Sequence, residues 1–410
     1  MKKLHIKTWQ RPLRSLVSLW LGLAIALMTN LPFFNSFFWA AAQPPDPDSK
    51  SASELRGVWL TNVDSDVLFS RDKLSQAVQR LKRLNFNTIY PTVWHEGYTL
   101  YPSVVAENTF GKAVSPIPEW QGRDMLAEAI ELGHEQKLAV IPWFEFGLMS
   151  EERAELTRLH PEWLTSRKDG SKVFVYGERG QHRFVWLNPL RPEVQKLLVD
   201  LIMEVVTKYN VDGIQIDDHF GMPAELGYDD YTIALYQKEH NGKRPPEDIN
   251  DPEWTRWRSH FVTDLMVKIF ASIKTTKPNC LISLSPNPRA FSYQHYLQDW
   301  YRWVDLGFIN ELIVQVYRSE MAEFVNELES PELREIRKKI PVGIGVLAGL
   351  RVQNVAMELI ESQVKATRDR NFQGFSFFFY ETLGDRDLAF ANLLAAPAIR
   401  PSKPVSIRKT

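Results

Sequence analysis

The chain has 410 residues, of which 44% are hydrophobic and 12% aromatic, and its 49 lysines and arginines nearly balance its 50 aspartates and glutamates. A net charge of -1 argues against a nucleic-acid-binding protein, whose surface carries a basic patch. The apolar content is enough for a large packed core, and the 13 tryptophans include candidates for stacking on sugar rings. The single cysteine, Cys280, excludes an internal disulfide and is expected to be a core residue.

Residues 1–42 have the pattern of a secretory signal peptide. Five lysines and arginines precede an apolar stretch over 16–28, and Ala40-Ala41-Ala42 forms a small-residue cleavage site. A polar, proline-containing linker follows over 43–53. We expect cleavage after Ala42, export to the periplasm, cell envelope or extracellular space, and no stable membrane insertion of the mature chain. The alternative is an uncleaved anchor, because residues 31–39 add apolar length.

Eight short apolar segments alternate with helical segments through the rest of the chain. The predicted strands cover residues 55–62, 86–94, 138–147, 211–218, 280–286, 309–317, 341–349 and 372–381. Between them, apolar residues recur at spacings of three and four, as in an amphipathic helix. The predicted helices cover residues 77–85, 125–136, 191–210, 254–278, 296–307, 333–340 and 356–371. Pro192 suits the first turn of the third of these helices.

Regular alternation of strands and helices predicts parallel strands joined by right-handed crossovers. Eight such units indicate an α/β fold of the (β/α)8 TIM-barrel type, as a single domain over residues 54–396. The alternative is an open doubly wound sheet, but no predicted strand is followed by a glycine-rich dinucleotide-binding turn. The tail over 397–410 is basic and contains proline, and we expect it to be loose.

Charged residues follow the fourth predicted strand, at the end of the barrel where TIM-barrel enzymes have their active sites. This strand ends in Asp217, Asp218 and His219. Because side chains alternate along a strand, Gln215, Asp217 and His219 share one face, and Asp217 points into the barrel mouth if Ile216 packs against the helices. Asp217 is therefore the first catalytic candidate, with Asp218 beside it to orient it. The alternative for both carboxylates is structural, as a helix cap or in a buried polar network.

Glycoside hydrolysis requires two carboxyl groups, of which one is ionised and the other protonated. An apolar setting raises the pKa of the protonated one. Glu145 lies between Phe144 and Phe146, and Glu381 follows the aromatic run 375–380, so both are candidates for the general acid. A salt bridge is the alternative role for Glu145. Other polar and aromatic residues of the strands are expected to bind substrate: Trp59, Asn62, Trp94, Trp143, Gln215, His219 and Asn287.

Motifs for other chemistries are absent from the sequence. There is no H-E-x-x-H motif, no cysteine pair, no serine nucleophile elbow and no phosphate-binding loop. His95 and His219 both lie at predicted strand ends, but two isolated histidines are a weak indication of a metal site. We therefore expect neither a metal nor a cofactor.

A series of motifs resembles the glycosyl-hydrolase-like 10 family, a group of exported bacterial proteins. The motifs are ELRGVWLTN, LNFNTIYPTVW, TLYPS, HPEWLT, WLNPLRPEVQ, VDGIQIDDHFG, LIVQVYRS and GFSFFFYETL, which lie between residues 54 and 383. The resemblance implies a (β/α)8 barrel related to amylase-like hydrolases. It also implies activity on the glycan strands of peptidoglycan, including strands stripped of peptides.

The same resemblance implies roles for individual residues. Asp217 falls where amylase-like barrels keep a carboxylate nucleophile on the fourth strand, and Arg56, Asn188, Gln315 and Tyr317 lie in motifs expected to line the subsites. Two departures concern the general acid. The fifth strand, LISLSPNP, lacks the glutamate of amylase-like enzymes, and WFEFGLM replaces an Asn-Pro-Tyr-type turn after the third strand.

The sequence thus predicts an exported glycoside hydrolase that acts on bacterial cell-wall or related polysaccharide, with peptidoglycan glycan strands favoured. A second hypothesis is a non-catalytic glycan-binding barrel that has lost its acid. A third is a metal-dependent polysaccharide deacetylase with Asp217, Asp218 and His219 as ligands, although such an enzyme would be expected to have more histidines at the rim.

Overall fold

The structure is a computed structural model that describes residues 53–176, 181–351 and 353–401. The predicted signal peptide over 1–42, and the linker apart from Ser53, lie outside the described residues. Among the described helices, none combines the length and the apolar character needed to cross a membrane.

Nine strands of the described chain form one parallel sheet in the order β5-β2-β1-β16-β13-β12-β11-β10-β6. Its two outer members, β5 (Ala139–Val140) and β6 (Trp143–Phe144), are halves of one strand interrupted at Pro142. Because β2 pairs with β5 and β10 pairs with β6, the sheet closes into a barrel of eight strands. The predicted (β/α)8 architecture is confirmed, and the open doubly wound sheet is wrong.

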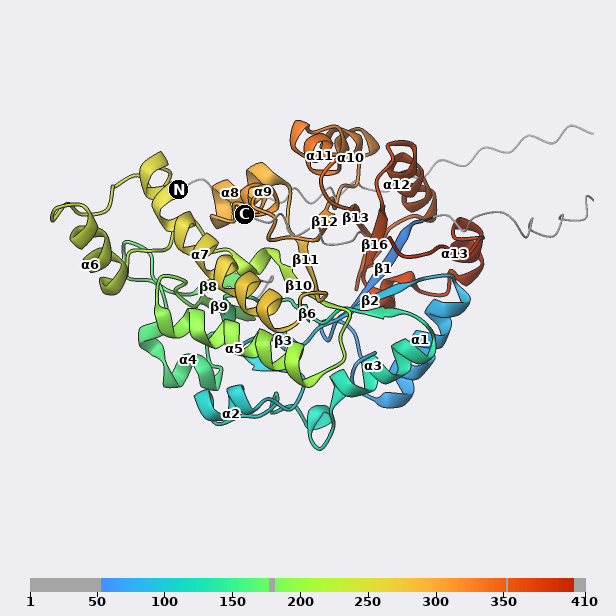
Figure 1. Cartoon of the computed structure of the whole chain (residues 1–410), viewed down its shortest axis with the longest axis horizontal. Helices are drawn as coiled ribbons and strands as arrows, with labels where there is room; N and C mark the ends of the chain where they lie inside the picture. The colour runs from blue at the N-terminus through green and yellow to red at the C-terminus, as the bar shows by residue number, and fades with distance from the viewer. Residues whose placement is uncertain (1–52, 177–180, 352, 402–410) are drawn as a thin grey trace, which may run out of the picture. The chain divides into compact units, whose positions relative to one another are not determined.

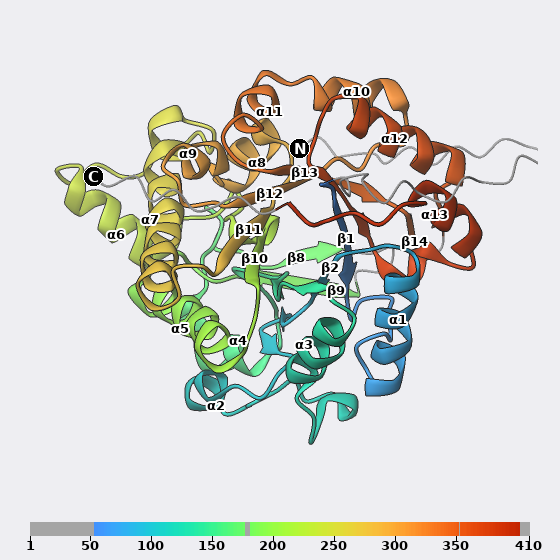
Figure 2. The same cartoon turned by 45° about the vertical axis from the view of Figure 1, so that its right-hand side comes forward.

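The other barrel strands are β1 (Leu55–Leu60), β2 (Thr88–Pro91), β10 (Gly213–Asp217), β11 (Leu281–Ser285), β12 (Glu311–Gln315), β13 (Val342–Leu347) and β16 (Gly374–Phe378). Helices surround them, as Figure 1 shows, and the turned view shows the same ring (Figure 2). The helices are α1 (Arg71–Arg83), α2 (Val104–Phe110), α3 (Met125–Glu135), α4 (Glu155–Leu159), α5 (Pro192–Lys208), α6 (Asp230–Glu239), α7 (Pro252–Thr276), α8 (Arg289–Tyr296), α9 (Trp300–Asp305), α10 (Met321–Leu328), α11 (Pro331–Ile336), α12 (Met357–Asp369) and α13 (Asp387–Leu393).

Short elements decorate the loops of the barrel. They are the hairpins β3 (Trp94–His95) with β4 (Tyr98–Thr99) and β14 (Gly349–Leu350) with β15 (Gln353–Asn354), the antiparallel sheet of β7 (Met149–Glu151), β9 (His182–Trp186) and β8 (Phe174–Tyr176), and 3-10 turns at Pro118–Trp120, Pro161–Trp163, Asp218–Phe220 and Tyr380–Leu383. Apart from β14 and β15, these strands follow β2 and β6, so the loops after the second and third barrel strands are the most elaborate.

Local sequence explains how the helices begin and which face they bury. The hydroxyl of Ser70 accepts a hydrogen bond from the Lys73 amide and caps α1. Leu74, Val78 and Leu81 then recur at helical spacing and are fully buried. Pro192 occupies the first turn of α5, where its missing N–H has no cost.

The barrel interior is lined by inward-facing side chains of alternate strand positions. Leu55, Trp59, Tyr90, Ile141, Trp143 and Ile313 form a cluster of their own, separate from the core between strands and helices. Small residues make room for the aromatic rings. At Gly57, a Cβ atom would lie 2.7 Å from the Tyr90 ring, so only glycine fits there.

A buried carboxylate, Glu311, lies inside the barrel near its base and is 1% exposed. Its Oε1 accepts hydrogen bonds from the Tyr90 hydroxyl at 3.1 Å and the Ser283 hydroxyl at 3.0 Å. Its Oε2 is paired with the Arg400 guanidinium. Ser283 in turn accepts a hydrogen bond from Gln215 at 3.0 Å.

Arg400 comes from the tail that sequence analysis expects to be loose. The expectation is wrong for the first tail residues, because Ile399 bridges to Ser53 and Arg400 reaches into the base of the barrel. The physical reason is the need of buried Glu311 for a cation, which a count of basic and proline residues does not reveal. Residues 402–410 lie outside the described residues.

We predict that Arg400→Met lowers the free energy of unfolding by about 3 kcal/mol, because it leaves the Glu311 carboxylate buried without its cation. The measurement is urea denaturation of the full chain at neutral pH. The matched control is Arg400→Met combined with Glu311→Gln, which removes the charge and should recover most of the loss. Equal loss in the single and double variants would contradict the account.

Candidate active site

Asp217 and Glu145 end neighbouring barrel strands at the same level. Gln215 and Ile216 of β10 pair with Trp143 and Phe144 of β6, so the next residues, Asp217 and Glu145, follow in register. Both residues occupy strand positions whose side chains point into the barrel. Asp217 is 2% exposed and Glu145 is 7% exposed. The parallel strands thus bring two carboxyl groups to the carboxyl-terminal rim of the barrel, as the alternation along the strands predicts.

The Asp217 side chain is held by donors from the next two strands of the barrel. Its Oδ1 accepts hydrogen bonds from the Ser285 hydroxyl at 2.7 Å and the Gln315 amide at 2.8 Å. Its backbone carbonyl accepts from the Gln298 amide at 2.9 Å. Since Oδ1 already has two partners, Oδ2 is the oxygen left for His219 and for a ligand.

His219 connects the carboxylates. Its Nδ1 lies 3.1 Å from the backbone oxygen of Glu145, 3.5 Å from Asp217 Oδ2 and 3.4 Å from Asp218 Oδ1. A carbonyl oxygen only accepts, so Nδ1 carries a proton. Partial burial lowers the pKa of His219, but Asp218, Asp217 and Glu145 outweigh it and raise that pKa to about 10. The imidazole is therefore cationic at neutral pH.

Asp218 does not lie on the opposite face that strand alternation predicts, because its carboxylate is close to that of Asp217 and 3.4 Å from the same His219 nitrogen. It is partly buried, and its Oδ2 accepts a hydrogen bond from the Asn287 amide at 2.5 Å. The residue begins the 3-10 turn Asp218–Phe220. Burial, followed by repulsion from Asp218, raises the pKa of Asp217 well above its usual value, while His219 opposes this change.

Glu145 has an apolar setting. It follows Phe144 and precedes Phe146, both buried, and its Oε2 accepts a hydrogen bond from the Thr92 hydroxyl at 3.0 Å. Burial raises the pKa of Glu145 to about 7. Glu145 makes no salt bridge to a lysine or arginine among the described residues, so the alternative structural role of the sequence analysis has no support here.

Aromatic residues form the floor and one wall of the site. The Trp59 indole donates to Gln215 at 2.7 Å, and its ring lies 6.1 Å from that of Trp143. Phe378 packs against Trp143 at 6.4 Å and against Tyr317 at 5.7 Å. Burial, followed by the charge of Asp217, raises the pKa of Tyr317 well above its usual value. Trp59 and Gln215 are fully buried and support the site from below.

Three residues assigned to the substrate by sequence lie elsewhere. Arg56 is on the outward-facing phase of β1, where it pairs with Glu54 and donates to the carbonyls of Leu394 and Ala396. Trp94 is fully buried and donates to the Gly147 carbonyl at 3.0 Å. Asn188 is fully buried and bonds to Thr232 at 2.8 Å, which ties its loop to α6. Each of the three forms hydrogen bonds to buried polar groups of the fold. Each therefore has a structural role, although its motif also contains site residues.

Glu381, the rival acid, also has a structural setting. Its Oε1 accepts hydrogen bonds from the Ser65 hydroxyl and the Val67 amide, so it fixes the loop after β1. Burial raises its pKa, as for Glu145. Glu381, however, follows β16, the eighth strand of the barrel. Asp217 ends β10, the fourth strand, on the opposite side of the barrel. Glu145 is therefore the better-placed partner of Asp217.

Two site residues were missed by sequence reasoning. Thr92, which holds Glu145, follows β2 within a predicted strand, and Gln298, which holds Asp217, lies in the loop between α8 and α9. Thr92 could have been found from its position at a strand end. Gln298 has no sequence signal, because a loop amide becomes part of the site only through the tertiary fold.

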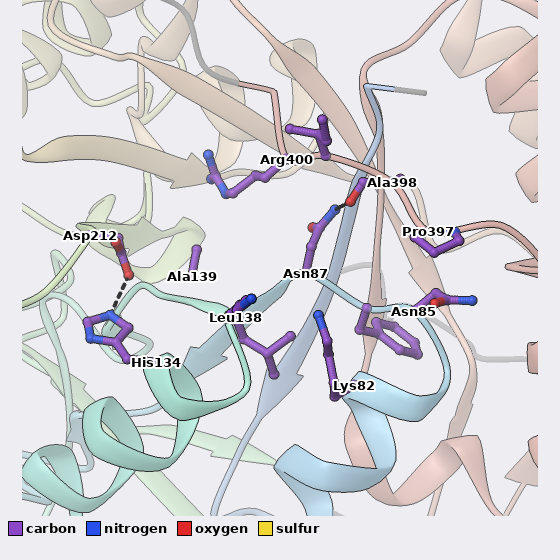
Figure 3. Close-up of a pocket in the computed structure, with 13 residues that line it drawn as sticks. Lys82, Asn85, Asn87, His134, Leu138, Ala139, Asp212, Pro397, Ala398 and Arg400 are labelled. Atoms are coloured by element: carbon purple, nitrogen blue, oxygen red, sulfur yellow. Dashed lines mark hydrogen bonds and ion pairs between the residues drawn. The ribbon is translucent and has the colours of Figure 1, made fainter. Parts of the chain in front are cut away.

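A cavity of about 440 Å³ lies at the opposite end of the barrel. Figure 3 shows it between the residues before β2, β5 and β10 and the tail, with His134 bonded to Asp212 at its edge. It is lined by Lys82, Lys137 and Arg400 among others, and has no carboxyl pair. The cavity is therefore separate from the carboxylate site.

We predict that Glu145→Gln stabilises the protein at pH 8 but not at pH 4. The folded-state pKa of about 7 exceeds the ordinary value of 4.5, so folding favours the protonated carboxyl. This contribution is fully present below pH 4.5 and is lost as the pH rises through 7. At pH 8 the amide should gain on the order of 1–3 kcal/mol in unfolding free energy relative to the ionised carboxylate.

Urea denaturation at the two pH values measures this difference. The exposed Glu119→Gln serves as the control for loss of one acidic side chain at the surface. A stability change at Glu145 that is the same at pH 4 and pH 8 would show that its carboxyl is not held in the protonated form by the fold.

Comparison with known proteins identifies relatives of this chain. The profile of the family described as glycosyl hydrolase-like 10 matches residues 54–366. Glycosyl hydrolase DigH of Escherichia coli (strain K12) is 26% identical over 330 residues, which cover 68% of this chain and 69% of DigH. Glycosyl hydrolase YngK of Bacillus subtilis (strain 168) is 25% identical over 304 residues, covering 66% of this chain and 56% of YngK.

Solved structures show the same fold at low sequence identity. The PgaB (BpsB) glycoside hydrolase domain from Bordetella bronchiseptica superposes with a TM-score of 0.58 at 12% identity, covering 85% of this chain and 100% of that domain. The catalytic domain of beta-amylase from Paenibacillus polymyxa gives 0.53 at 10% identity, covering 82% and 95%. With the family profile matched over most of the barrel, the chain belongs to the glycosyl hydrolase-like 10 family.

Proposed function

We propose that the chain is an exported glycoside hydrolase that cleaves bacterial cell-wall or related polysaccharide, with the glycan strands of peptidoglycan as the favoured substrate. The observation that carries the proposal is the pair of Asp217 and Glu145, level on adjacent strands and buried in unlike surroundings. Family membership supports a glycan substrate. Export rests on the signal-peptide pattern of residues 1–42.

In the proposed reaction, Glu145 is the general acid. With a pKa of about 7 it holds a proton at neutral pH and gives it to the glycosidic oxygen as the bond breaks. Asp217 is the carboxylate that stabilises the positive charge of the sugar in the transition state, either as nucleophile or as base for water. The hydrogen bonds from Ser285 and Gln315 fix Oδ1, so that Oδ2 faces the reacting sugar.

His219 has a positioning role in this scheme. As a cation between Asp217 and Asp218, it favours the ionised form of Asp217, against burial and repulsion from Asp218. Its bond to the Glu145 carbonyl also ties the two strand ends together. A sugar that develops positive charge near Oδ2 favours ionised Asp217 further, which makes the interaction strongest in the transition state.

The deacetylase hypothesis uses the same cluster with a metal ion. Ligand atoms of Asp217, Asp218 and His219 lie within 4.8 Å of one another, which is compatible with a cation. Two contacts favour the hydrolase instead: His219 Nδ1 carries a proton toward the Glu145 carbonyl, and Oδ1 of Asp217 already accepts two hydrogen bonds. Activity on glycans that survives chelation with EDTA, with shorter chains as products, supports the hydrolase.

We predict that Asp217→Asn lowers hydrolysis of purified peptidoglycan glycan strands by at least about 1000-fold while the chain still folds and binds glycan, because the amide keeps the shape and loses the charge. Product analysis by mass spectrometry, beside thermal melting, measures both effects. Asp218→Asn is the matched control and should lose less activity. If the parent chain binds the strands without cleaving them, the glycan-binding hypothesis replaces this one.

We predict that Glu145→Gln loses activity on glycan strands but recovers much of it on aryl glycosides. A good leaving group needs less protonation, so loss of a general acid is partly bypassed. The parent rate should also fall as the pH rises above about 7, where Glu145 loses its proton. Glu381→Gln is the control and should treat both substrates alike. Identical behaviour of the two variants would refute the assignment of the acid.

A further inference from the structure

A row of aromatic rings leads from the carboxylate site to the surface of the protein. Phe146, which follows Glu145, stacks on the His219 imidazole with the two ring centroids 5.7 Å apart. The Phe184 ring of β9 lies 5.5 Å from that of Phe146, and the Tyr176 ring of β8 lies 6.0 Å from that of Phe184. These three residues, Phe146, Phe184 and Tyr176, are called the aromatic track below.

The pairing of β8 with β9 places the outer rings of the track on one face of their small sheet. Tyr176 lies opposite His182 in the antiparallel register, and Phe184 is two residues from His182 along β9. Directly opposed residues point to the same side of a sheet, and so do residues two apart on one strand. This face is turned toward the carboxylate site, because Phe184 contacts Phe146. Val175, the neighbour of Tyr176, therefore points to the opposite face.

The exposure of the rings increases outward along the track. Phe146 is 5% exposed, Phe184 is partly buried, and Tyr176 is 44% exposed. Single apolar side chains are common on protein surfaces, so an isolated exposed tyrosine would carry no meaning. Tyr176 is instead the outer end of a continuous series of rings that begins beside Glu145. The track thus extends the site from its buried carboxyl groups to the solvent.

A charged pair lies beside the outer part of the track. The Arg167 guanidinium lies 3.7 Å from the ring of Phe174, which is two residues before Tyr176 and shares its face. Arg167 Nε donates to Glu225 Oε2 at 2.6 Å, and both side chains keep some exposure to solvent. A sugar ring has an apolar C–H face and polar hydroxyl groups at its edge. Aromatic rings flanked by charged hydrogen-bonding groups match both parts of it.

We propose that the aromatic track binds further sugar units of a glycan chain that occupies the carboxylate site, with Tyr176 as the outermost ring on which a sugar stacks. The proposal rests on the proposed function for the identity of the ligand as a glycan. Continuity with the carboxylate site selects this occupant, because a chain that extends outward past Glu145 and Phe146 meets Phe184 and then Tyr176. The protein should therefore bind chains long enough to reach Tyr176 more tightly than a disaccharide.

The experiment measures glycan affinity by calorimetry in the Asp217→Asn background, where turnover does not interfere. The long probe is an octasaccharide fraction of peptidoglycan glycan strands without peptides, and the short probe is the disaccharide of the same strands. Tyr176→Ala should weaken binding of the octasaccharide about fivefold, as expected for the loss of one ring contact, and leave the disaccharide unchanged. Tyr176→Phe, which keeps the ring, should retain most of the affinity.

Val175→Ala is the matched control, since Val175 is 54% exposed on the opposite face of the same strand. It should leave the affinity for both probes unchanged. Thermal melting of each variant separates binding from folding. Because Tyr176 is nearly half exposed, Tyr176→Ala should melt close to the background.

Three results would overturn the track as a binding surface. They are unchanged octasaccharide affinity in Tyr176→Ala, an equal loss for both probes, and an equal loss in Val175→Ala. Failure of the parent chain to cleave the strands, with Tyr176-dependent binding of the octasaccharide intact, would overturn only the hydrolase. Absence of binding in every variant would overturn both proposals.

Discussion

The burial of the Asp217 carboxylate at the end of a parallel strand is the constraint on which the site depends. A charge removed from water is tolerated only where donors or an opposite charge replace the solvent. Here those groups come from β11, β12 and the turn after β10, so the order of strands in the barrel decides whether the charge is supported. The strand order that defines the fold is therefore also what allows the site to hold the Asp217 carboxylate.

The two carboxyl groups differ in what surrounds them rather than in how deeply they are buried. Glu145 has one neutral hydroxyl as partner and aromatic rings along the chain on either side, a setting that favours its uncharged form. Asp217 has two donors on one oxygen and an imidazolium near the other, so its surroundings oppose the effect of burial. Burial raises the pKa of both groups, so the ionised form of Asp217 depends on the nearby His219 imidazolium and on the two donors to its Oδ1.

The sequence predicted the eight strands and the inward phase of Gln215 and Asp217, because strand period and strand ends are local properties. The sequence did not reveal that Pro142 divides the third strand into β5 and β6. The two halves occupy the same place in the barrel, where β5 pairs with β2 and β6 pairs with β10. Arg56 and Asn188 were misplaced for a common reason. Both lie in motifs that also contain site residues. Arg56 instead donates to the backbone carbonyl of Ala396, and Asn188 to the hydroxyl of Thr232, and both partners are distant in sequence. The presence of a residue in a motif does not show whether its role lies in folding or in the chemistry of the site.

The pairing of Arg400 with Glu311 has a consequence for how the chain reaches its final state. Arg400 follows all eight barrel strands in the sequence, and Glu311 lies on the sixth of them. A nascent chain that has made β12 therefore contains an acidic side chain whose counter-charge has not yet been synthesised. Closing the barrel around an unpaired carboxylate is unfavourable, so docking of the tail and closure of the sheet become a single cooperative event. The base of the barrel is therefore complete only once Arg400 has been made, whereas the donors that hold the Asp217 carboxylate at the rim all come from residues made earlier.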